Sequence, residues 1–302
     1  MKYIRPILVV LLIGILGTLI VFLSPLKKEL PTSFSPLFQL LGEPVKSAST
    51  AVGRILPIDD ADEVEFGNKI AKRLHFSDQT TTKEAAYLAN LIENLALYSK
   101  KKMNYRVFVE SSIYPNAYAL PGGTIVITRG LLNILKSESE LVAVLAHEMG
   151  HIEQSHCLNS VKYRIAANTV GMADFGAIVD LASQILVRHA YSKTQENEAD
   201  VYSFDLMTHT QYDPNGVYLA FERIHGYYKE KQSKKNPPSI IADYFASHPR
   251  IEHRIGKFKV KGAKWWRFHS NTKRYIGIQN LEERTSFFVT QYKQDWKISG
   301  NK

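Results

Sequence analysis

Residues 147–151 have the types and spacing for metal-dependent hydrolysis. The sequence His147-Glu148-Met149-Gly150-His151 places two imidazoles about one helical turn apart, so both can reach one tetrahedral ion. Glu148 borders the same face, where a carboxylate can take a proton from a metal-activated water, as the general base of a zinc hydrolase does. Apolar residues 141–146 predict a buried helix, in which unpaired His and Glu side chains would be costly. The pattern therefore predicts a catalytic zinc site.

A third protein ligand must come from outside this motif. The chain has a single cysteine, which excludes a four-cysteine site. The three-histidine form of the motif needs glycine at 154 and histidine at 157, where this chain has Gln154 and Cys157. In a continuous helix His156 and Cys157 point away from the ion, so we interpret both as structural. The third ligand is therefore expected to be a carboxylate on another helix.

A predicted helix over residues 190–208 supplies that carboxylate. Glu196 and Asp200 are four residues apart on one face of this helix, whereas Glu198 points nearly the opposite way. We expect one of the first two to bind zinc and the other to orient a zinc-bound histidine. Their spacing alone does not assign the two roles.

The elements around these motifs are mostly helical. Apolar residues at helical spacing predict helices over 63–74, 83–100, 138–158, 173–187, 190–208 and 217–229. Alternation and β-branched residues predict strands over 105–110 and 123–128, the second after a Pro-Gly-Gly turn. The predicted fold class is α+β, predominantly helical, with a small sheet ahead of the two metal-binding helices.

Several motifs, taken in order along the chain, resemble metallopeptidase family 48, the HtpX-like and CAAX-prenyl-endopeptidase-like gluzincins. They are Asn116 to Gly123 with Thr128 to Leu132, His147-Glu148-x-x-His151, Glu196-Asn197-Glu198-Ala199-Asp200, and Ser247-His248-Pro249 followed by Arg254. The resemblance covers roughly residues 60–257 and implies that this region is a gluzincin-type zinc metallopeptidase domain with one zinc ion per chain. It also implies that Glu196 is the third ligand and Asp200 the partner that orients a histidine.

The resemblance further implies where a substrate binds. Ala117, Tyr118 and Ala119 would lie on an open edge strand, onto which an extended polypeptide adds by main-chain hydrogen bonds. Such binding favours unfolded or misfolded polypeptides. His248 is a catalytic candidate with three alternatives: it stabilises the oxyanion, it binds the zinc as a latch, or it is a histidine at a helix start beside Pro249.

The amino-terminal region predicts a membrane anchor. Residues 6–26 are uncharged and mostly Leu, Ile and Val, long enough to span about 30 Å of hydrocarbon. The run lacks a small-residue cleavage site, so we predict an uncleaved anchor over residues 1–29, with a cleaved signal as the alternative. Lys2 and Arg5 before the run favour an inside amino terminus, which places the catalytic domain in the periplasm as a single-pass inner-membrane protein. The reverse topology is the alternative.

Three other regions complete the organisation. Residues 30–59 hold four prolines and predict a juxtamembrane linker. Asp174 and Asp180 interrupt the apolar region 165–187, which favours a packing helix over a re-entrant membrane segment. Residues 258–302 form a basic, aromatic carboxy-terminal extension. This extension either packs on the peptidase as a solvated subdomain or lies on an anionic membrane surface. No nucleic-acid partner is expected, since no stacking or groove-reading module is present.

The combined prediction is a zinc-dependent metalloendopeptidase that cleaves unfolded or misfolded envelope and membrane-associated proteins in protein quality control. The alternative is a non-proteolytic, chaperone-like binding factor whose zinc site is structural or latent. The water-activating Glu148 favours the enzyme. Prenyl-protein processing would require a large intramembrane chamber, which one apolar span does not supply.

Overall fold

The computed structural model describes residues 60–74, 76, 82–101, 103–160, 191–232 and 251–298, all within one unit that spans residues 37–302. The predicted anchor, the predicted linker, region 165–187 and His248 lie outside the described residues. Within the described ranges, no helix combines the length and the apolarity needed to cross a bilayer.

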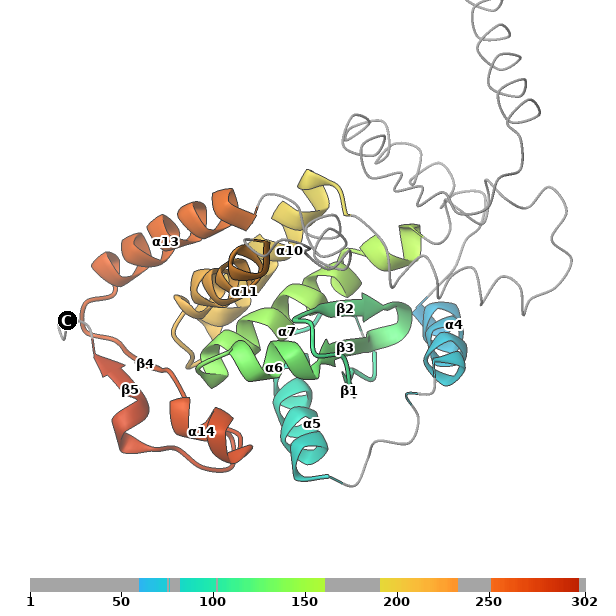
Figure 1. Cartoon of the computed structure of the whole chain (residues 1–302), viewed down its shortest axis with the longest axis horizontal. Coiled ribbons are helices and arrows are strands. Elements are labelled where there is room, and N and C mark those ends of the chain that lie inside the picture. The colour runs from blue at the N-terminus through green and yellow to red at the C-terminus, as the bar shows by residue number, and fades with distance from the viewer. Residues whose placement is uncertain are drawn as a thin grey trace, which may run out of the picture. The chain divides into compact units, whose positions relative to one another are not determined.

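The described residues are mostly helical and include a small three-stranded sheet, as predicted (Figure 1). They also include a two-stranded sheet that was not predicted. The helices are α4 (Asp60–Arg73), α5 (Lys83–Ala96), α6 (Arg129–Ile134), α7 (Glu138–Glu153), α10 (Lys193–His209), α11 (Gly216–Gln232), α13 (Ile251–Phe268) and α14 (Ile278–Glu283). The strands are β1 (Arg106–Glu110), β2 (Ala117–Leu120), β3 (Thr124–Thr128), β4 (Lys273–Tyr275) and β5 (Trp296–Ile298). Two short 3₁₀ turns span Pro121–Gly123 and Lys293–Asp295.

The larger sheet has the strand order β1-β3-β2, with β1 parallel and β2 antiparallel to β3. The Pro-Gly-Gly turn joins β2 to β3, and both glycines adopt positive φ angles (77° and 92°) that side-chain-bearing residues rarely adopt. A Cβ atom on Gly122 would also lie 2.8 Å from Val64 Cα of α4. The tight turn leaves β2 at one edge of the sheet.

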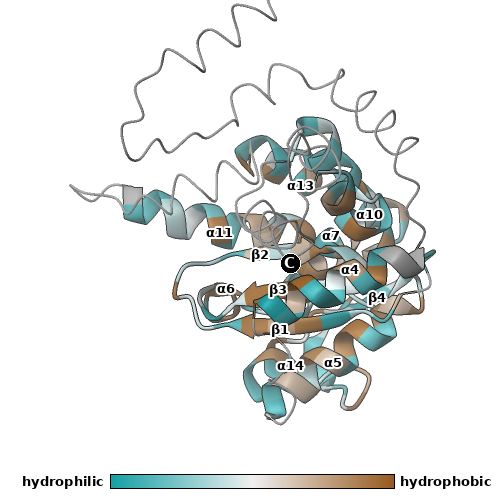
Figure 2. Ribbon diagram, turned by 90° about the vertical axis from the view of Figure 1, so that its right-hand side faces the viewer, coloured by the Kyte–Doolittle hydropathy of each residue, from teal (hydrophilic) through white to brown (hydrophobic). Residues whose placement is uncertain are grey.

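Helix α7 is the central element, in contact with β2, α10 and α11 (Figure 1). Its side chains from Glu138 to Ile152 are all buried, as expected for a helix covered on every side. The Ser137 side chain caps its start by accepting from Glu140 N. In Figure 2 the strands β1 and β3 are mostly apolar, whereas α10 and α13 show both polar and apolar residues, as helices at the outside of a core do.

Helix α7 ends earlier than the predicted helix 138–158. It stops at Glu153, Ser155 adopts a left-handed conformation (φ 56°), and helical structure resumes at His156. Lys101 holds this turn, since its Nζ lies 2.8 Å from Ser155 Oγ and 2.7 Å from Glu63 Oε2. Glu153 itself accepts hydrogen bonds from the main-chain N–H groups of residues 100 and 101. These contacts end the helix at Glu153, although the helical spacing of apolar residues continues beyond it.

The carboxy-terminal region packs against the start of α7. Helix α13 (Ile251–Phe268) crosses the predicted boundary between the peptidase domain and the extension, which was placed between residues 257 and 258. The first amides of α7 donate to it: Glu138 N to Gly277 O (2.8 Å) and Ser139 N to Ile276 O (2.9 Å). Amides in the first turn of a helix have no partner within the helix, so the extension satisfies two of them. Its Tyr275 is fully buried in the same core.

Candidate metal centre

His147, His151 and Glu196 come together as a possible metal site. One ligand atom from each lies within 4.8 Å of the other two, and all three side chains are buried. His151 Nε2 is 3.1 Å from His147 Nε2 and 3.4 Å from Glu196 Oε1, and Glu196 Oε2 is 3.8 Å from His147 Nε2. Two ligands at about 2.0–2.1 Å from a tetrahedral ion lie roughly 3.3 Å apart. The three residues therefore fit a single zinc ion.

Small residues allow α7 and α10 to approach closely enough to build this cluster. A Cβ atom on Gly150 would lie only 2.9 Å from Ala199 Cα and 3.1 Å from Ala199 O. One turn along, Ser203 Oγ donates to Ala143 O at 2.8 Å. Gly150 lies within the first motif and Ala199 within the second, so both motifs contain a residue that sets the helix spacing as well as residues that could bind metal.

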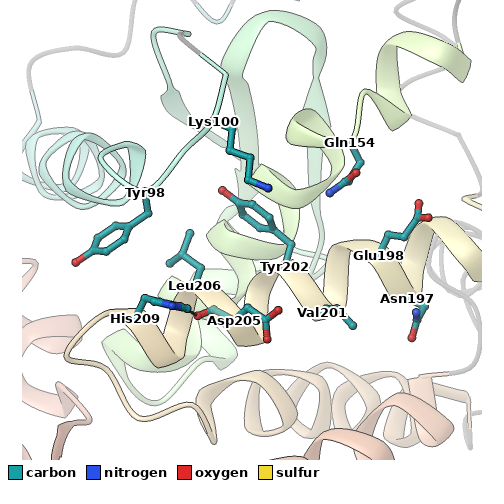
Figure 3. Close-up of a pocket in the computed structure, with 10 residues that line it drawn as sticks. All are labelled: Tyr98, Lys100, Gln154, Asn197, Glu198, Val201, Tyr202, Asp205, Leu206 and His209. Atoms are coloured by element: carbon teal, nitrogen blue, oxygen red, sulfur yellow. Dashed lines mark hydrogen bonds between the residues drawn. The ribbon is translucent and has the colours of Figure 1, made fainter.

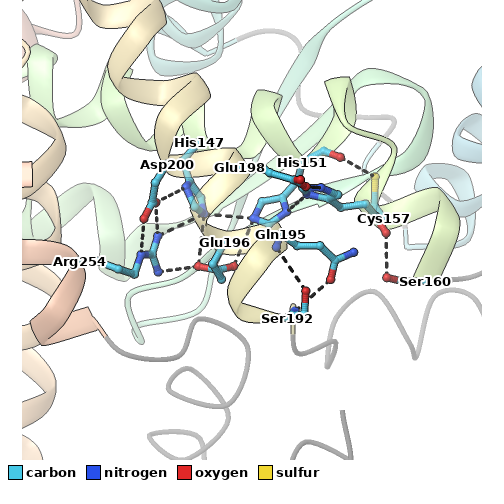
Figure 4. A network of polar contacts seen from close by, with 11 residues as sticks. His147, His151, Cys157, Ser160, Ser192, Gln195, Glu196, Glu198, Asp200 and Arg254 are labelled. Atoms are coloured by element: carbon cyan, nitrogen blue, oxygen red, sulfur yellow. Dashed lines mark hydrogen bonds and ion pairs between the residues drawn. The ribbon is translucent and has the colours of Figure 1, made fainter. Parts of the chain in front are cut away.

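The start of α10 fixes the position of Glu196. Ser192 and Gln195 form a reciprocal capping box, with Gln195 N donating to Ser192 Oγ and Ser192 N donating to Gln195 Oε1 (Figure 4). Glu196 follows in the first turn. Immediately before the cap, the Tyr191 ring stacks on His151 at a centroid distance of 3.7 Å. The chain therefore enters α10 already packed on one of the histidines.

A buried carboxylate, itself bound by a guanidinium, contacts the His147 ring on the side away from the cluster. His147 Nδ1 lies 3.0 Å from Asp200 Oδ1, which leaves Nε2 to face the cluster. Arg254 donates to both Asp200 oxygens (Nε at 2.9 Å, Nη2 at 2.6 Å), and its Nη1 lies 2.6 Å from Glu196 Oε2 (Figure 4). The guanidinium also lies over the Phe221 ring at 4.2 Å. Arg254 therefore links the third candidate ligand to the partner of the first.

These contacts set the ionisation of Asp200. Burial raises the pKa of this carboxyl, but the charge of Arg254 and the hydrogen bond from His147 outweigh burial and hold the pKa below its ordinary value. An ionised Asp200 accepts the Nδ1–H of His147, the arrangement that orients metal-bound histidines.

His151 has a different partner. Its Nδ1 lies 3.1 Å from His156 Nδ1, and His156 Nε2 lies 3.0 Å from Glu198 Oε2. Burial lowers the pKa of His151 well below its ordinary value, although a hydrogen bond to the Glu196 carboxylate acts in the opposite direction. The imidazole is therefore neutral near pH 7, the form that binds metal.

The predicted general base, Glu148, lies beside one of the candidate ligands. It is buried and lines a small pocket together with the candidate ligand His147. The other residues of this pocket come from β2, α6, α7, α11 and α13: Ala117, Leu131, Val144, Phe221, Ile224 and Arg254. The predicted base, a predicted ligand and the predicted substrate strand therefore meet at one pocket.

The charges of the cluster also suit a divalent cation. The carboxylates of Glu148, Glu196 and Asp200 are buried beside one buried guanidinium, that of Arg254. When all four are ionised they carry a net charge of minus two. Because buried net charge is costly, a doubly charged cation beside them would stabilise the site.

The edge strand β2 presents alternate main-chain groups outward. Thr128 N donates to Asn116 O, and in an antiparallel ladder every second residue shares this bonding pattern. Tyr118 therefore bonds to β3, while the N–H and C=O groups of Ala117 and Ala119 point away from it. The Tyr118 side chain makes a hydrogen bond with Glu110.

The structure adds Arg254, His156 and Glu198 to the residues expected near the site. Arg254 follows the Ser247-His248-Pro249 motif, and it occupies the apolar stripe of α13 between Ile251 and Phe258, which is a signal for a buried arginine. His156, which was interpreted as structural, contacts the candidate ligand His151.

A second pocket lies along another face of α10 (Figure 3). Helix α10 supplies most of its lining, and residues from the ends of α5 and α7 face them: Tyr98, Lys100, Gln154, Asn197, Glu198, Val201, Tyr202, Asp205, Leu206 and His209. Among the residues that the structure describes, Glu198 alone belongs both to this pocket and to the contacts of the candidate metal centre.

Comparisons with known proteins identify relatives of this chain. The sequence profile of peptidase family M48 matches residues 81–260. Metalloprotease LoiP of Escherichia coli is 31% identical over 172 residues, which cover 54% of this chain and 65% of LoiP. The mitochondrial metalloendopeptidase OMA1 of Schizosaccharomyces pombe is 29% identical over 202 residues, 65% of this chain and 56% of OMA1. A protease HtpX homolog of Dictyoglomus thermophilum is 25% identical over 231 residues, 62% of this chain and 73% of the homolog.

Proposed function

Because this chain belongs to peptidase family M48, as the motifs predicted, we propose that it is a zinc-dependent metalloendopeptidase that cleaves unfolded or misfolded polypeptides. The observation that carries the proposal is the convergence of His147, His151 and Glu196, with Glu148 in the adjoining pocket. We assign one zinc ion per chain to these three ligands.

The residues of the chain divide the chemistry among them. When bound, zinc supplies a Lewis acid that polarises the scissile carbonyl and makes a water molecule more acidic. Glu148 accepts the proton of the attacking water and passes it to the leaving amine. Asp200 keeps the proton of His147 on Nδ1, so that Nε2 faces the metal. Arg254 neutralises part of the buried carboxylate charge and fixes the position of Glu196.

The substrate adds to the edge of the larger sheet as an extended strand. Ala117 and Ala119 would bond to its main chain, and Ala117 lines the same pocket as Glu148. This mode reads the peptide backbone, so it selects chains that are already unfolded. We expect a series of peptides, each N-methylated at one position, to lose cleavage at alternate positions. Equal cleavage of every N-methylated peptide would contradict strand addition.

The predicted anchor over residues 1–29 supports a location at the inner membrane, with the catalytic domain in the periplasm. The proposed substrates are therefore misfolded envelope and membrane-associated proteins. His248 stays a catalytic candidate with the three alternatives given above.

Zinc content and cleavage of unfolded casein test the proposed function. The full chain, purified in detergent, should bind about one zinc ion and cleave casein. Glu148→Gln should keep the zinc and lose cleavage, because it removes only the proton acceptor. Glu196→Ala should lose both. A chaperone-like factor is the alternative, and its casein binding would be the same with and without Glu148→Gln, with no cleavage in either.

A further inference from the structure

We propose that His156 and Glu198 are positioning residues of the metal centre. They form a hydrogen-bonded relay that holds the His151 ring in the orientation that zinc binding requires. The relay rests on the proposed zinc site, and it assigns a role to two residues whose side chains do not belong to the ligand cluster.

The relay is a continuous chain of three side chains. His151 Nδ1 and His156 Nδ1 are 3.1 Å apart, and His156 Nε2 and Glu198 Oε2 are 3.0 Å apart. Both histidines are buried, and the Glu198 side chain is 31% exposed. The contacts therefore lead from the innermost histidine of the cluster to the surface.

With zinc bound, one arrangement of protons satisfies every contact of the relay. His151 turns Nε2 toward His147 and Glu196, so this nitrogen must carry a lone pair to bind zinc, and Nδ1 carries the hydrogen. His151 Nδ1–H then donates to His156 Nδ1. His156 must in turn carry its hydrogen on Nε2, which donates to the Glu198 carboxylate. Glu198 thus selects the tautomer of His156, and His156 selects the tautomer of His151.

The backbone brings the relay together. In an unbroken helix His156 would point away from the metal ligands. The left-handed turn at Ser155 redirects the chain, so that His156 meets His151 instead. The Tyr191 ring stacks on the His151 face at 3.7 Å. The stacking restrains the plane of the His151 ring, and the bond from Nδ1 restrains its rotation within that plane.

The outer end of the relay faces the second pocket. Glu198 lines that pocket with Gln154 and Asn197 (Figure 3). If Glu198 is removed, water from the pocket can accept the hydrogen bond of His156 in its place. His156 is buried, so water cannot replace it in the same way. We expect removal of His156 to have the larger effect.

The test measures zinc affinity of the full chain by competition with a chelator. His156→Ala should weaken zinc binding about 10–100-fold, the usual effect of removing a residue that orients a metal ligand. Glu198→Ala should weaken it less, and the double variant should match His156→Ala because the two residues act in series. His225 and Glu252 form another histidine–glutamate pair, 3.5 Å apart, and supply the matched control. Alanine at either control position should leave zinc affinity at the wild-type value.

A conservative variant separates positioning from packing. In His156→Asn the side-chain oxygen lies near the place of Nδ1 and can still accept from His151, so this variant should recover most of the affinity lost in His156→Ala. Thermal unfolding of the metal-free variants checks that they fold. If His156→Ala does not fold, the partly exposed Glu198→Ala carries the test.

The possible results are distinct. Wild-type zinc affinity in His156→Ala, or in Glu198→Ala when that variant carries the test, would overturn the relay. Additive losses in the double variant would overturn the arrangement in series. No zinc in the wild-type chain would instead overturn the proposed metal site, and the relay with it.

Discussion

The two histidines assigned to zinc have unlike supports. His147 contacts a buried carboxylate, Asp200, which Arg254 ties to the third ligand Glu196. His151 contacts a neutral partner, His156. The carboxylate that His156 contacts in turn, that of Glu198, is partly exposed to solvent. The groups that support His147 are thus buried and charged, and Arg254 also contacts another ligand. The groups that support His151 form a linear chain of hydrogen bonds that ends at a partly exposed carboxylate. We infer that Asp200 and Arg254 stabilise the whole site, whereas His156 and Glu198 orient only the His151 ring.

Among the substitutions at the two supports, removal of Arg254 should have the largest effect, a loss of folding stability. Arg254→Ala leaves the carboxylates of Glu196 and Asp200 buried without their shared cation, and breaking a buried ion pair in this way costs about 3–5 kcal/mol. Urea unfolding of the metal-free chain measures this loss. Arg254→Lys is the matched control: it keeps the charge but loses the planar fork, so it should recover only part of the stability. Wild-type stability in Arg254→Ala would contradict the assigned role.

Loss of the Asp200 charge should come next. Asp200→Asn keeps the shape of the side chain but weakens its hold on His147 Nδ1, so we expect about 10–100-fold weaker zinc binding. Asp205→Asn, on an exposed part of the same helix, is the control and should bind zinc as wild type does. An equal effect of both substitutions would indicate a general loss of helix charge rather than a specific contact.

Glu138 contrasts with Asp200, because no ion pair joins it to a cation within the described part of the chain. Glu138, at the start of α7, accepts from Tyr212 Oη and Phe287 N, but burial dominates and raises its pKa to about 7. A carboxyl whose folded pKa is raised binds more protons in the folded state. It therefore costs stability as pH rises from the unfolded pKa, about 4.3, through 7.

The variant Glu138→Gln removes this cost. It should be more stable than wild type by on the order of 2 kcal/mol at pH 8, and the difference should vanish near pH 4. Urea unfolding across this pH range measures it. Glu140→Gln is the control in the same turn, and it should gain nothing because Glu140 faces Arg223. A constant difference at all pH values would exclude ionisation of Glu138 as the cause.

The smallest effect is expected at the outer end of the relay. Glu198→Gln keeps an oxygen that accepts from His156, so zinc affinity should fall by less than about tenfold. It is the same carboxylate-to-amide change as Asp200→Asn, measured by the same chelator competition. A loss of zinc affinity at Glu198 as large as that at Asp200 would show that His147 and His151 are supported equally.

The parts of the site that were predictable are those that depend on local spacing. His147 and His151 share a helix, and Glu196 and Asp200 share another, so the period of the helix was enough to pair them. The α+β class and the small sheet followed from residue patterns in the same way. The approach of the two helices depends on Gly150 meeting Ala199, a contact between segments distant in sequence.

The residues that were missed depend on tertiary structure. His156 reaches His151 only because Ser155 adopts a left-handed conformation, and no glycine or proline marks that turn in the sequence. Arg254 comes from a helix about 100 residues beyond the first motif. The packing of the carboxy-terminal extension on the first turn of α7 uses main-chain atoms at Gly277, which leave no side-chain pattern.

A zinc-edge anomalous difference map from crystals of the zinc-loaded full chain tests the central claim most directly. The ligand set predicts one strong peak, with His147 Nε2, His151 Nε2 and a Glu196 carboxylate oxygen each about 2.0–2.2 Å away. A peak bound by other residues, or a zinc ion without Glu196 among its ligands, would contradict the account.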